Sequence, residues 1–279
     1  MRFCNFVGPI AGVSVSLAVL AAVAGCNKSA TPGDTHLTSD TLVIDAPAAM
    51  KQPLQNEESV TTGDSTFRIV PLEPIQVLRK RALAATPPDE QGQFKAPDLV
   101  ELTDLEPSIK LDIRYATEDN FMGSVMYSEA RAFLQRPAAE ALVAAHRKLA
   151  SEGLGILVYD GYRPWAITKM FWDATPEHQR EFVANPSDGS RHNRGCAVDI
   201  GLYDLTTGNP IKMPSDYDEF TTRAYVDYDG GSEEARRYRA LLIRTMEENG
   251  FNVYSKEWWH FDFDDWQSYP IQNIAFADL

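Results

Sequence analysis

Residues 190–199 read SRHNRGCAVD, and residues 257–260 read EWWH. The two stretches contain side chains that bind metal ions: the imidazoles of His192 and His260 and the carboxylate of Asp199. Histidine offers a neutral nitrogen and aspartate a hard oxygen, a mixture that suits Zn²⁺. Two histidines and one carboxylate leave a fourth tetrahedral position for water, as a catalytic zinc requires. Each histidine alone could be a hydrogen-bonded structural residue, so the prediction of a metal site depends on the pair of stretches.

The alternation of side chains along a strand gives a test of the second stretch. If residues 257–263 formed one regular strand, Glu257 and His260 would point to opposite faces, because they are three residues apart. For both to serve one site, Glu257 must lie where the strand starts or on a bulge or bend. We therefore predict an irregularity of the strand beside Glu257.

The surrounding sequence predicts a mixture of helices and strands. Residues 137–152 begin with proline, carry an apolar stripe and precede a glycine, which predicts a helix on which we expect His146 to be solvated. Ser232 before Glu233 and Glu234 is typical of a capped helix start. Further elements are a strand at 154–159, short helices at 164–172 and 176–184, and a strand pair or bent strand at 251–263. Strands and helices do not alternate regularly, so the sequence predicts an α+β fold.

The first 25 residues differ in composition from the rest of the chain. Arg2 precedes an apolar run over residues 6–23, which ends in Ala24 and Gly25 directly before Cys26. The run is typical of a secretory signal. The small residues before a cysteine resemble the lipobox of bacterial lipoproteins, in which the cysteine is lipidated and becomes the N-terminus. An ordinary signal peptide with an incidental cysteine is the alternative.

We expect three parts in the chain: a signal peptide at 1–25, a lipid-anchored and largely flexible tether at 26–96, and a compact domain at 97–279. Residues 27–65 are rich in Thr, Ser, Pro, Gly, Asp and Gln, a composition typical of a flexible tether. The apolar residues of 66–84 predict a strand and a short helix before the compact domain.

The charge of the chain excludes one class of partner. Its 279 residues include 26 Lys and Arg against 40 Asp and Glu, a formal net charge of −14. A surface that follows phosphates needs clustered cations, so nucleic acid is not an expected partner. Cys196 would be the one cysteine left beside the lipidated Cys26, which excludes an internal disulfide, and we expect Cys196 to serve packing. No obligate protein partner is evident.

The order of several motifs resembles a known family. The pattern SxHxxGxAxD followed by ExWH is similar to the zinc D,D-peptidases of the cell wall, a group that includes the zinc-binding domain of hedgehog proteins. YATEDNF at 115–121, DGYRP at 160–164 and SDYD at 215–218 narrow the resemblance to the D-alanyl-D-alanine dipeptidases over residues 97–265. It implies a single domain with a small, mostly antiparallel sheet flanked by helices. It also implies one Zn²⁺ per chain, bound by His192, Asp199 and His260.

The resemblance further implies hydrolysis of the dipeptide D-Ala-D-Ala to two D-alanines. Glu257 would be the general base and acid for the zinc-bound water, and Arg163 would stabilise the oxyanion. A structural ion pair with Asp160 is the alternative role for Arg163.

Three further residues would bind the substrate. By the resemblance Asp218 would receive the ammonium group, and Ser190 and Tyr115 would contact the dipeptide. A carboxylate at this position would reject longer peptides, whose amine is already acylated. The alternative for Asp218 is a solvated position in an acidic loop with Asp216 and Glu219.

One position departs from the family pattern. The residue before the first histidine ligand is often serine in the dipeptidases, and here it is Arg191, which puts in doubt any substrate contact assigned to that position.

Two rival functions and one location complete the expectations. A D,D-carboxypeptidase or endopeptidase acting on peptidoglycan stem peptides would use the same metal chemistry. A module that keeps zinc without turnover is disfavoured by the presence of both Glu257 and Arg163. The lipid on Cys26 would hold the protein on an envelope membrane facing the periplasm. Asn27 is not the aspartate associated with inner-membrane retention, so the outer membrane is preferred.

Overall fold

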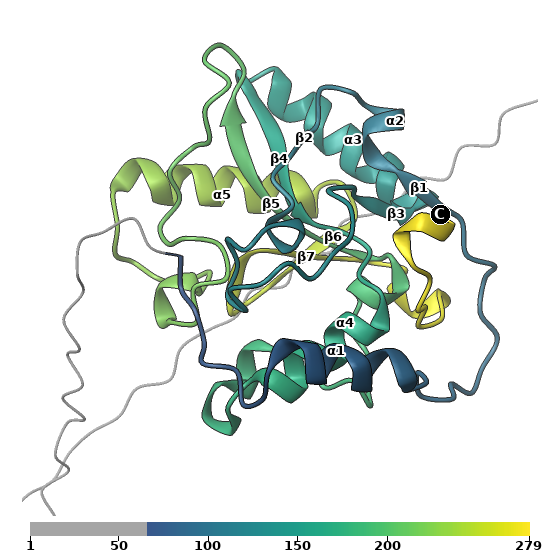
Figure 1. Ribbon diagram of the computed structural model, residues 1–279. Helices are drawn as coiled ribbons and strands as arrows, with labels where there is room; N and C mark the ends of the chain where they lie inside the picture. The colour runs from purple at the N-terminus through teal and green to yellow at the C-terminus, as the bar shows by residue number, and fades with distance from the viewer. Residues whose placement is uncertain (1–65) are drawn as a thin grey trace, which may run out of the picture. The chain divides into compact units, whose positions relative to one another are not determined.

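A five-stranded sheet forms the centre of the computed structural model, which describes residues 66–279 (Figure 1). Its strands, in spatial order, are β2 (Lys110–Leu111), β4 (Leu154–Asp160), β5 (Ala197–Asp204), β7 (Glu257–Phe263) and β6 (Phe251–Tyr254). The β2–β4 pair is parallel and the other pairs are antiparallel. A second, two-stranded sheet pairs β1 (Leu99–Glu101) with β3 (Phe133–Gln135). The expected α+β fold with a small, mostly antiparallel sheet is confirmed.

Two long helices, α3 (Arg136–Ala150) and α5 (Glu233–Glu247), contact each other and the sheet (Figure 1). Pro137 lies in the first turn of α3, where its missing N–H is not needed. Ser232 caps α5, because its hydroxyl accepts a hydrogen bond from the N–H of Ala235 at 3.1 Å. Both predicted helices are confirmed to within two residues at their starts.

The central strands are buried over their whole length. Every residue of β4 is buried, and all but the last residue of β5 are. Strands covered on both sides read as continuous apolar runs, which is why 154–159 was predicted correctly. The predicted helix at 164–172 is α4 (Trp165–Ala174), whereas 176–184 forms only a 3₁₀ turn at Glu177–Phe182.

The segment before Pro97 corrects one expectation. Residues 66–96 fall in the range that we assigned to the tether, but helix α1 (Ile75–Ala84) packs on α4. Leu78 and Ala82 of α1 are fully buried in the core. Residues 66–74 form neither a helix nor the strand that we predicted, and the chain bends at Leu72 and Glu73. The domain therefore includes this segment, because its two apolar residues four positions apart fill a surface of α4.

The signal peptide, Cys26 and residues 27–65 lie outside the described residues. Helix α2 (Leu102–Leu105) completes the α-helices described. None of the helices in 66–279 combines the length and the apolar content that a membrane span requires.

Candidate active site

The three residues expected to bind a metal meet at one end of the central sheet. Asp199 of β5 and His260 of β7 are direct partners in the antiparallel ladder. His192 lies in a 3₁₀ turn (His192–Arg194) just before β5. Nδ1 of His260 lies 3.0 Å from Oδ1 of Asp199 and 3.1 Å from Nε2 of His192. Nε2 of His192 lies 3.4 Å from the same aspartate oxygen.

The outer atoms of these side chains are held by hydrogen bonds. Nδ1 of His192 donates to the carbonyl of Gly161 at 2.7 Å. Nε2 of His260 donates to Oδ1 of Asp262 at 2.9 Å. The hydroxyl of Tyr217 donates to Oδ2 of Asp199 at 2.9 Å. Such partners fix the ring tautomers, so the nitrogens that face the centre carry lone pairs.

This donor set fits a tetrahedral metal ion. Ligand atoms about 2.0–2.1 Å from a tetrahedral zinc lie about 3.3 Å from one another, close to the 3.0–3.4 Å found here. Burial opposes the charge of Asp199, but His192 and His260 hold the pKa of Asp199 well below its usual range. Burial also opposes the charge of His260, but Asp199 and Asp262 raise the pKa of His260 well above its usual value. A proton on this ring and a metal ion would use the same space, so metal binding releases protons.

Local sequence explains why His192 can reach this position. A Cβ on Gly161 would lie 2.8 Å from the carbonyl oxygen of Phe133, so only glycine permits the close approach there. Gly195 ends the 3₁₀ turn with a φ of 68°, in the left-handed region that favours glycine. The side-chain amide of Asn193 donates a hydrogen bond to the backbone carbonyl of Arg163 at 2.9 Å. This bond connects the 3₁₀ turn to the loop after β4.

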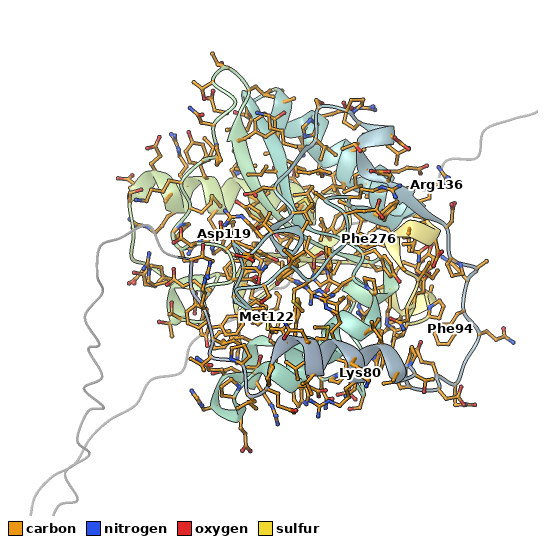
Figure 2. All side chains as sticks on the ribbon, in the orientation of Figure 1. Lys80, Phe94, Asp119, Met122, Arg136 and Phe276 are labelled. Atoms are coloured by element: carbon orange, nitrogen blue, oxygen red, sulfur yellow. The ribbon has the colours of Figure 1, made fainter. Side chains whose placement is uncertain are left out.

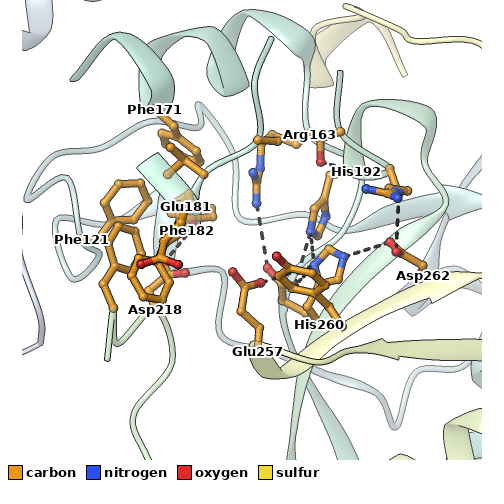
Figure 3. Close-up of a pocket in the computed structure, with 18 residues that line it drawn as sticks. Phe121, Arg163, Phe171, Glu181, Phe182, His192, Asp218, Glu257, His260 and Asp262 are labelled. Atoms are coloured by element: carbon orange, nitrogen blue, oxygen red, sulfur yellow. Dashed lines mark hydrogen bonds and ion pairs between the residues drawn. The ribbon is translucent and has the colours of Figure 1, made fainter. Parts of the chain in front are cut away.

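Glu257 lies beside the three ligand atoms, and the irregularity predicted for its strand is confirmed. It is the first residue of β7, and the register with β6 shifts between Val253 and Tyr254. The shift lets Oε2 of Glu257 come within 3.9 Å of Nδ1 of His260. Figure 3 shows the Glu257 carboxylate between Asp218 and His260. Burial raises the pKa of Glu257 to about 7, which suits a group that must take and return a proton near neutral pH.

Arg163 follows the end of β4 and makes the ion pair that we kept as its alternative role. Its Nε and Nη2 donate to Oδ2 of Asp160 at 2.9 and 2.7 Å, and the hydroxyl of Tyr127 donates to Oδ1 of Asp160 at 2.7 Å. Nη2 also lies 3.9 Å from Oδ2 of Asp199. Burial would lower the pKa of Arg163, but Asp160 raises it above its usual value. The ion pair therefore holds a charged guanidinium beside the ligand atoms.

Asp218 is buried and faces the same space, so the alternative of a solvated acidic loop is wrong. Its Oδ2 accepts a hydrogen bond from the hydroxyl of Tyr115 at 2.7 Å. Within residues 66–279 it is the one non-glycine residue with positive φ, 57°. Burial and the neighbouring Asp199 raise the pKa of Asp218. A cation bound next to Asp218 would relieve the cost of its buried charge.

One cavity of about 180 Å³ connects these groups. Ser190 lines it, and its hydroxyl oxygen accepts a hydrogen bond from the N–H of His192 at 3.2 Å. Arg191 lies at the rim, half-exposed, with Nε 3.5 Å from Oδ2 of Asp262. Buried Cys196 does not line the cavity. The residues that line the cavity and that we singled out from the sequence are Tyr115, Arg163, Ser190, His192, Asp199, Asp218, Glu257 and His260.

Sequence reasoning missed several residues that hold the site together. Asp262 lies two positions after His260, so strand alternation put it on the same face, but we gave it no role. Asp160 was considered only as a partner of Arg163. Tyr217 and Asn193 lie within the motifs quoted above, yet nothing in their spacing indicates which atoms they contact.

Comparisons with known proteins identify the family of this chain. The family model described as "D-ala-D-ala dipeptidase" matches residues 95–278. A D-alanyl-D-alanine dipeptidase of Escherichia coli K12 is 35% identical over 64% of this chain and 92% of its own length. A D-alanyl-D-alanine dipeptidase of Enterococcus faecium is 33% identical over 63% of this chain and 95% of its own length.

A solved structure is also similar in part. It is the vancomycin-resistance D,D-dipeptidase VanXYg in complex with a D-Ala-D-Ala phosphinate analogue, with 20% identity and a TM-score of 0.32. The similarity covers 49% of this chain and 53% of that chain.

Proposed function

This chain belongs to the D-alanyl-D-alanine dipeptidase family and is a metallopeptidase, and from that premise we propose that it hydrolyses free D-Ala-D-Ala with one Zn²⁺ held by His192, Asp199 and His260. The observation that carries the proposal is the triangle of three ligand atoms 3.0–3.4 Å apart, with the carboxylate of Glu257 beside it. A bound zinc supplies a Lewis acid that polarises the peptide carbonyl and lowers the pKa of water.

Glu257 is the proton carrier of the reaction. Its carboxylate takes a proton from the attacking water and returns it to the leaving amine. Its pKa of about 7 supports both halves of this task, because the group gains and loses a proton with little driving force either way.

Arg163 stabilises the negative oxygen of the tetrahedral intermediate. Guanidinium stays charged and offers several N–H groups. Its two hydrogen bonds to Asp160 use Nε and Nη2. Within the described residues Nη1 makes no hydrogen bond, so this nitrogen is free to meet a substrate oxygen. The ion pair and the catalytic role are therefore compatible, since Asp160 orients the guanidinium.

Asp218 recognises the free amine of the dipeptide, with Tyr115 and Ser190 as further contacts. An ammonium group would return the buried carboxylate of Asp218 to its charged form. A longer peptide has no ammonium here and would leave a buried acid unpaired, which disfavours its binding. This supports the dipeptide over stem peptides as substrate.

The test combines metal content with substrate preference. The whole chain should hold about one zinc by elemental analysis, lose turnover of D-Ala-D-Ala on chelation and regain it with Zn²⁺. Its kcat/KM for D-Ala-D-Ala should exceed that for a stem pentapeptide. A preference for the pentapeptide would instead assign a D,D-carboxypeptidase, and full turnover after metal removal would exclude the zinc mechanism.

We further propose that Cys26 is lipidated and anchors the enzyme to an envelope membrane on the periplasmic side, by preference the outer membrane. The support is the sequence alone, an apolar run ending in Ala24-Gly25-Cys26. Labelled fatty acid should enter the wild-type chain and not Cys26→Ser. Equal labelling of both would refute the assignment.

A further inference from the structure

The most exposed apolar side chains of the described residues gather around helix α1. Seven large apolar side chains are exposed in 66–279. Four belong to the segment 66–84. A fifth, Val125, lies next to α1, because its carbonyl accepts a hydrogen bond from Arg79 of that helix at 2.5 Å. We call these five, together with the exposed cations of 66–84, the α1 surface. Its apolar members and their exposed fractions are Val70 (83%), Leu72 (55%), Val77 (47%), Leu83 (69%) and Val125 (44%).

The charge of this segment is opposite to that of the rest of the protein. Residues 66–84 hold four Lys and Arg against one Glu, a charge of +3. The remaining residues hold 22 Lys and Arg against 39 Asp and Glu, a charge of −17. Arg68 and Arg79 donate to backbone carbonyls rather than to carboxylates. Lys80, on the solvent side of α1 (Figure 2), makes no ion pair within the described residues. Three positive charges, two of them exposed and that of Arg79 half-buried, therefore have no acidic partner within residues 66–279.

One side of α1 is free for a partner. Leu78 and Ala82 bury the opposite side against α4. At 100° per residue, Val77, Lys80 and Leu83 fall together on the exposed side, which mixes apolar and basic groups. A mainly apolar groove of about 200 Å³ lies next to it, lined by Leu83 and by Met126, Ile167 and Phe276 among others. Within one patch the surface thus offers apolar side chains, a recess and cations.

We propose that the α1 surface docks on an anionic lipid bilayer. Apolar side chains next to cations are the combination by which interfacial helices bind such a membrane. The order of the chain supports this occupant. Thr66, the first described residue, begins this segment, and Cys26 precedes it by 40 residues. A lipid on Cys26 would keep a bilayer within reach of this segment. The inference draws on the proposed lipid anchor and is independent of the proposed hydrolysis.

Docking would also orient the enzyme. The acidic remainder of the protein is repelled by an anionic surface, so attraction at one patch selects a single orientation. The cavity shares no residue with the apolar members of the α1 surface. The docked enzyme therefore keeps its hydrolytic residues unchanged.

The test measures amide hydrogen exchange of residues 66–84 in the whole chain incorporated in vesicles. Phosphatidylcholine vesicles with and without about one third phosphatidylglycerol are compared. A patch variant, Lys80→Glu with Leu83→Ser, is set against a matched control, Arg237→Glu with Leu205→Ser. The control makes the same charge change and loses an exposed leucine elsewhere, because the Arg237 side chain is 71% and Leu205 40% exposed.

We expect exchange in 66–84 to slow several-fold in the anionic vesicles and not in the neutral ones. Salt at about 1 M, where the Debye length is about 3 Å, should reverse the effect. The patch variant should weaken docking by at least about five-fold, the effect of about 1 kcal/mol per basic residue, and the control should dock like wild type. Equal exchange in both kinds of vesicle, or equal docking of patch and control variants, would overturn the proposal.

Discussion

Two buried histidine sites of this protein differ in how their polar atoms are matched. In the cavity, His192 and His260 turn lone pairs toward each other and toward Asp199, at 3.0–3.4 Å. Between α3 and β4, His146 has a complementary partner at each nitrogen. Its Nδ1 accepts from the N–H of Ile156 at 3.1 Å, and its Nε2 lies 2.9 Å from the hydroxyl of Ser108.

The difference separates a binding site from a structural one. The hydroxyl of Ser108 donates to Glu106, so its oxygen accepts a hydrogen bond from Nε2–H of His146. Each donor at this site is therefore paired with an acceptor. In the cavity the neutral rings would turn three acceptors toward one another, so either a proton on His260 or a metal ion must hold them together. Burial is the same in both: His146 and His192 are each 2% exposed. The pattern of donors and acceptors, rather than burial, distinguishes the proposed metal site from the structural histidine.

Replacing one histidine at each site with glutamine should give the largest difference between the two sites. His192→Gln should lose the bound zinc and with it nearly all turnover, because one of three ligands is gone. His146→Gln should keep about one zinc and wild-type kcat. Elemental analysis and D-Ala-D-Ala hydrolysis measure both. Equal zinc loss in the two variants would break the comparison.

The next largest effect should be a loss of catalysis that leaves metal binding intact. Glu257→Gln keeps the shape of the side chain and removes its proton transfer, so kcat should fall about 10²–10⁴-fold with zinc content unchanged. Glu181→Gln is the matched control, because Glu181 lines the same cavity but pairs with Lys256 at the surface. Steady-state kinetics should give the control nearly wild-type kcat. Unchanged turnover in Glu257→Gln would remove Glu257 from the mechanism.

Asp262 should contribute a smaller amount through His260. Asp262→Asn weakens the hydrogen bond that orients the ring, and such partners are typically worth about 10–100-fold in metal affinity. Competition with a chelator measures the zinc dissociation constant directly, apart from activity. Asp264→Asn, two residues on and exposed, is the control. Equal zinc affinity in the two variants would show that Asp262 does not orient the ligand.

The sequence predicted which three side chains come together as candidate metal ligands, because their residue types are chemically distinctive. It predicted the irregularity of β7 because the two-residue alternation of a strand cannot put Glu257 and His260 on one face. It misassigned His146, although this residue is four positions after Leu142 and three before Leu149, on the buried stripe of α3. The polarity of histidine outweighed that spacing in our interpretation.

Other features depended on partners that the sequence does not reveal. The short helix α1 carries only two fully buried residues, and its position is decided by α4, about 90 residues later. Asp160 and Asp262 act through hydrogen bonds to Arg163 and His260, and the geometry of these bonds exists only after β4, β5 and β7 have paired. Residue type therefore predicted the candidate metal ligands. The residues that orient their neighbours by hydrogen bonds, such as Asp160 and Asp262, are set by tertiary packing, which the sequence alone does not reveal.

The smallest effect should appear in the pH dependence of stability. Burial lowers the pKa of His146 below its ordinary value of 6.5, and the charge of Arg147 lowers it further. The opposing effect of Glu106, which raises the pKa, is smaller than that of burial. The unfolded chain therefore takes up a proton that the folded chain resists, so the contribution of His146 is complete above about pH 6.5 and is lost as the pH falls below it. His146→Gln should unfold more easily at pH 7.5, by about 1 kcal/mol for the lost hydrogen bonds, but lose less further stability at pH 5.5. Urea unfolding of both chains at the two pH values measures this. If the free energy of unfolding fell equally in both chains between pH 7.5 and 5.5, protonation of His146 would not contribute to stability. The contrast with the histidines of the cavity would then lose this support.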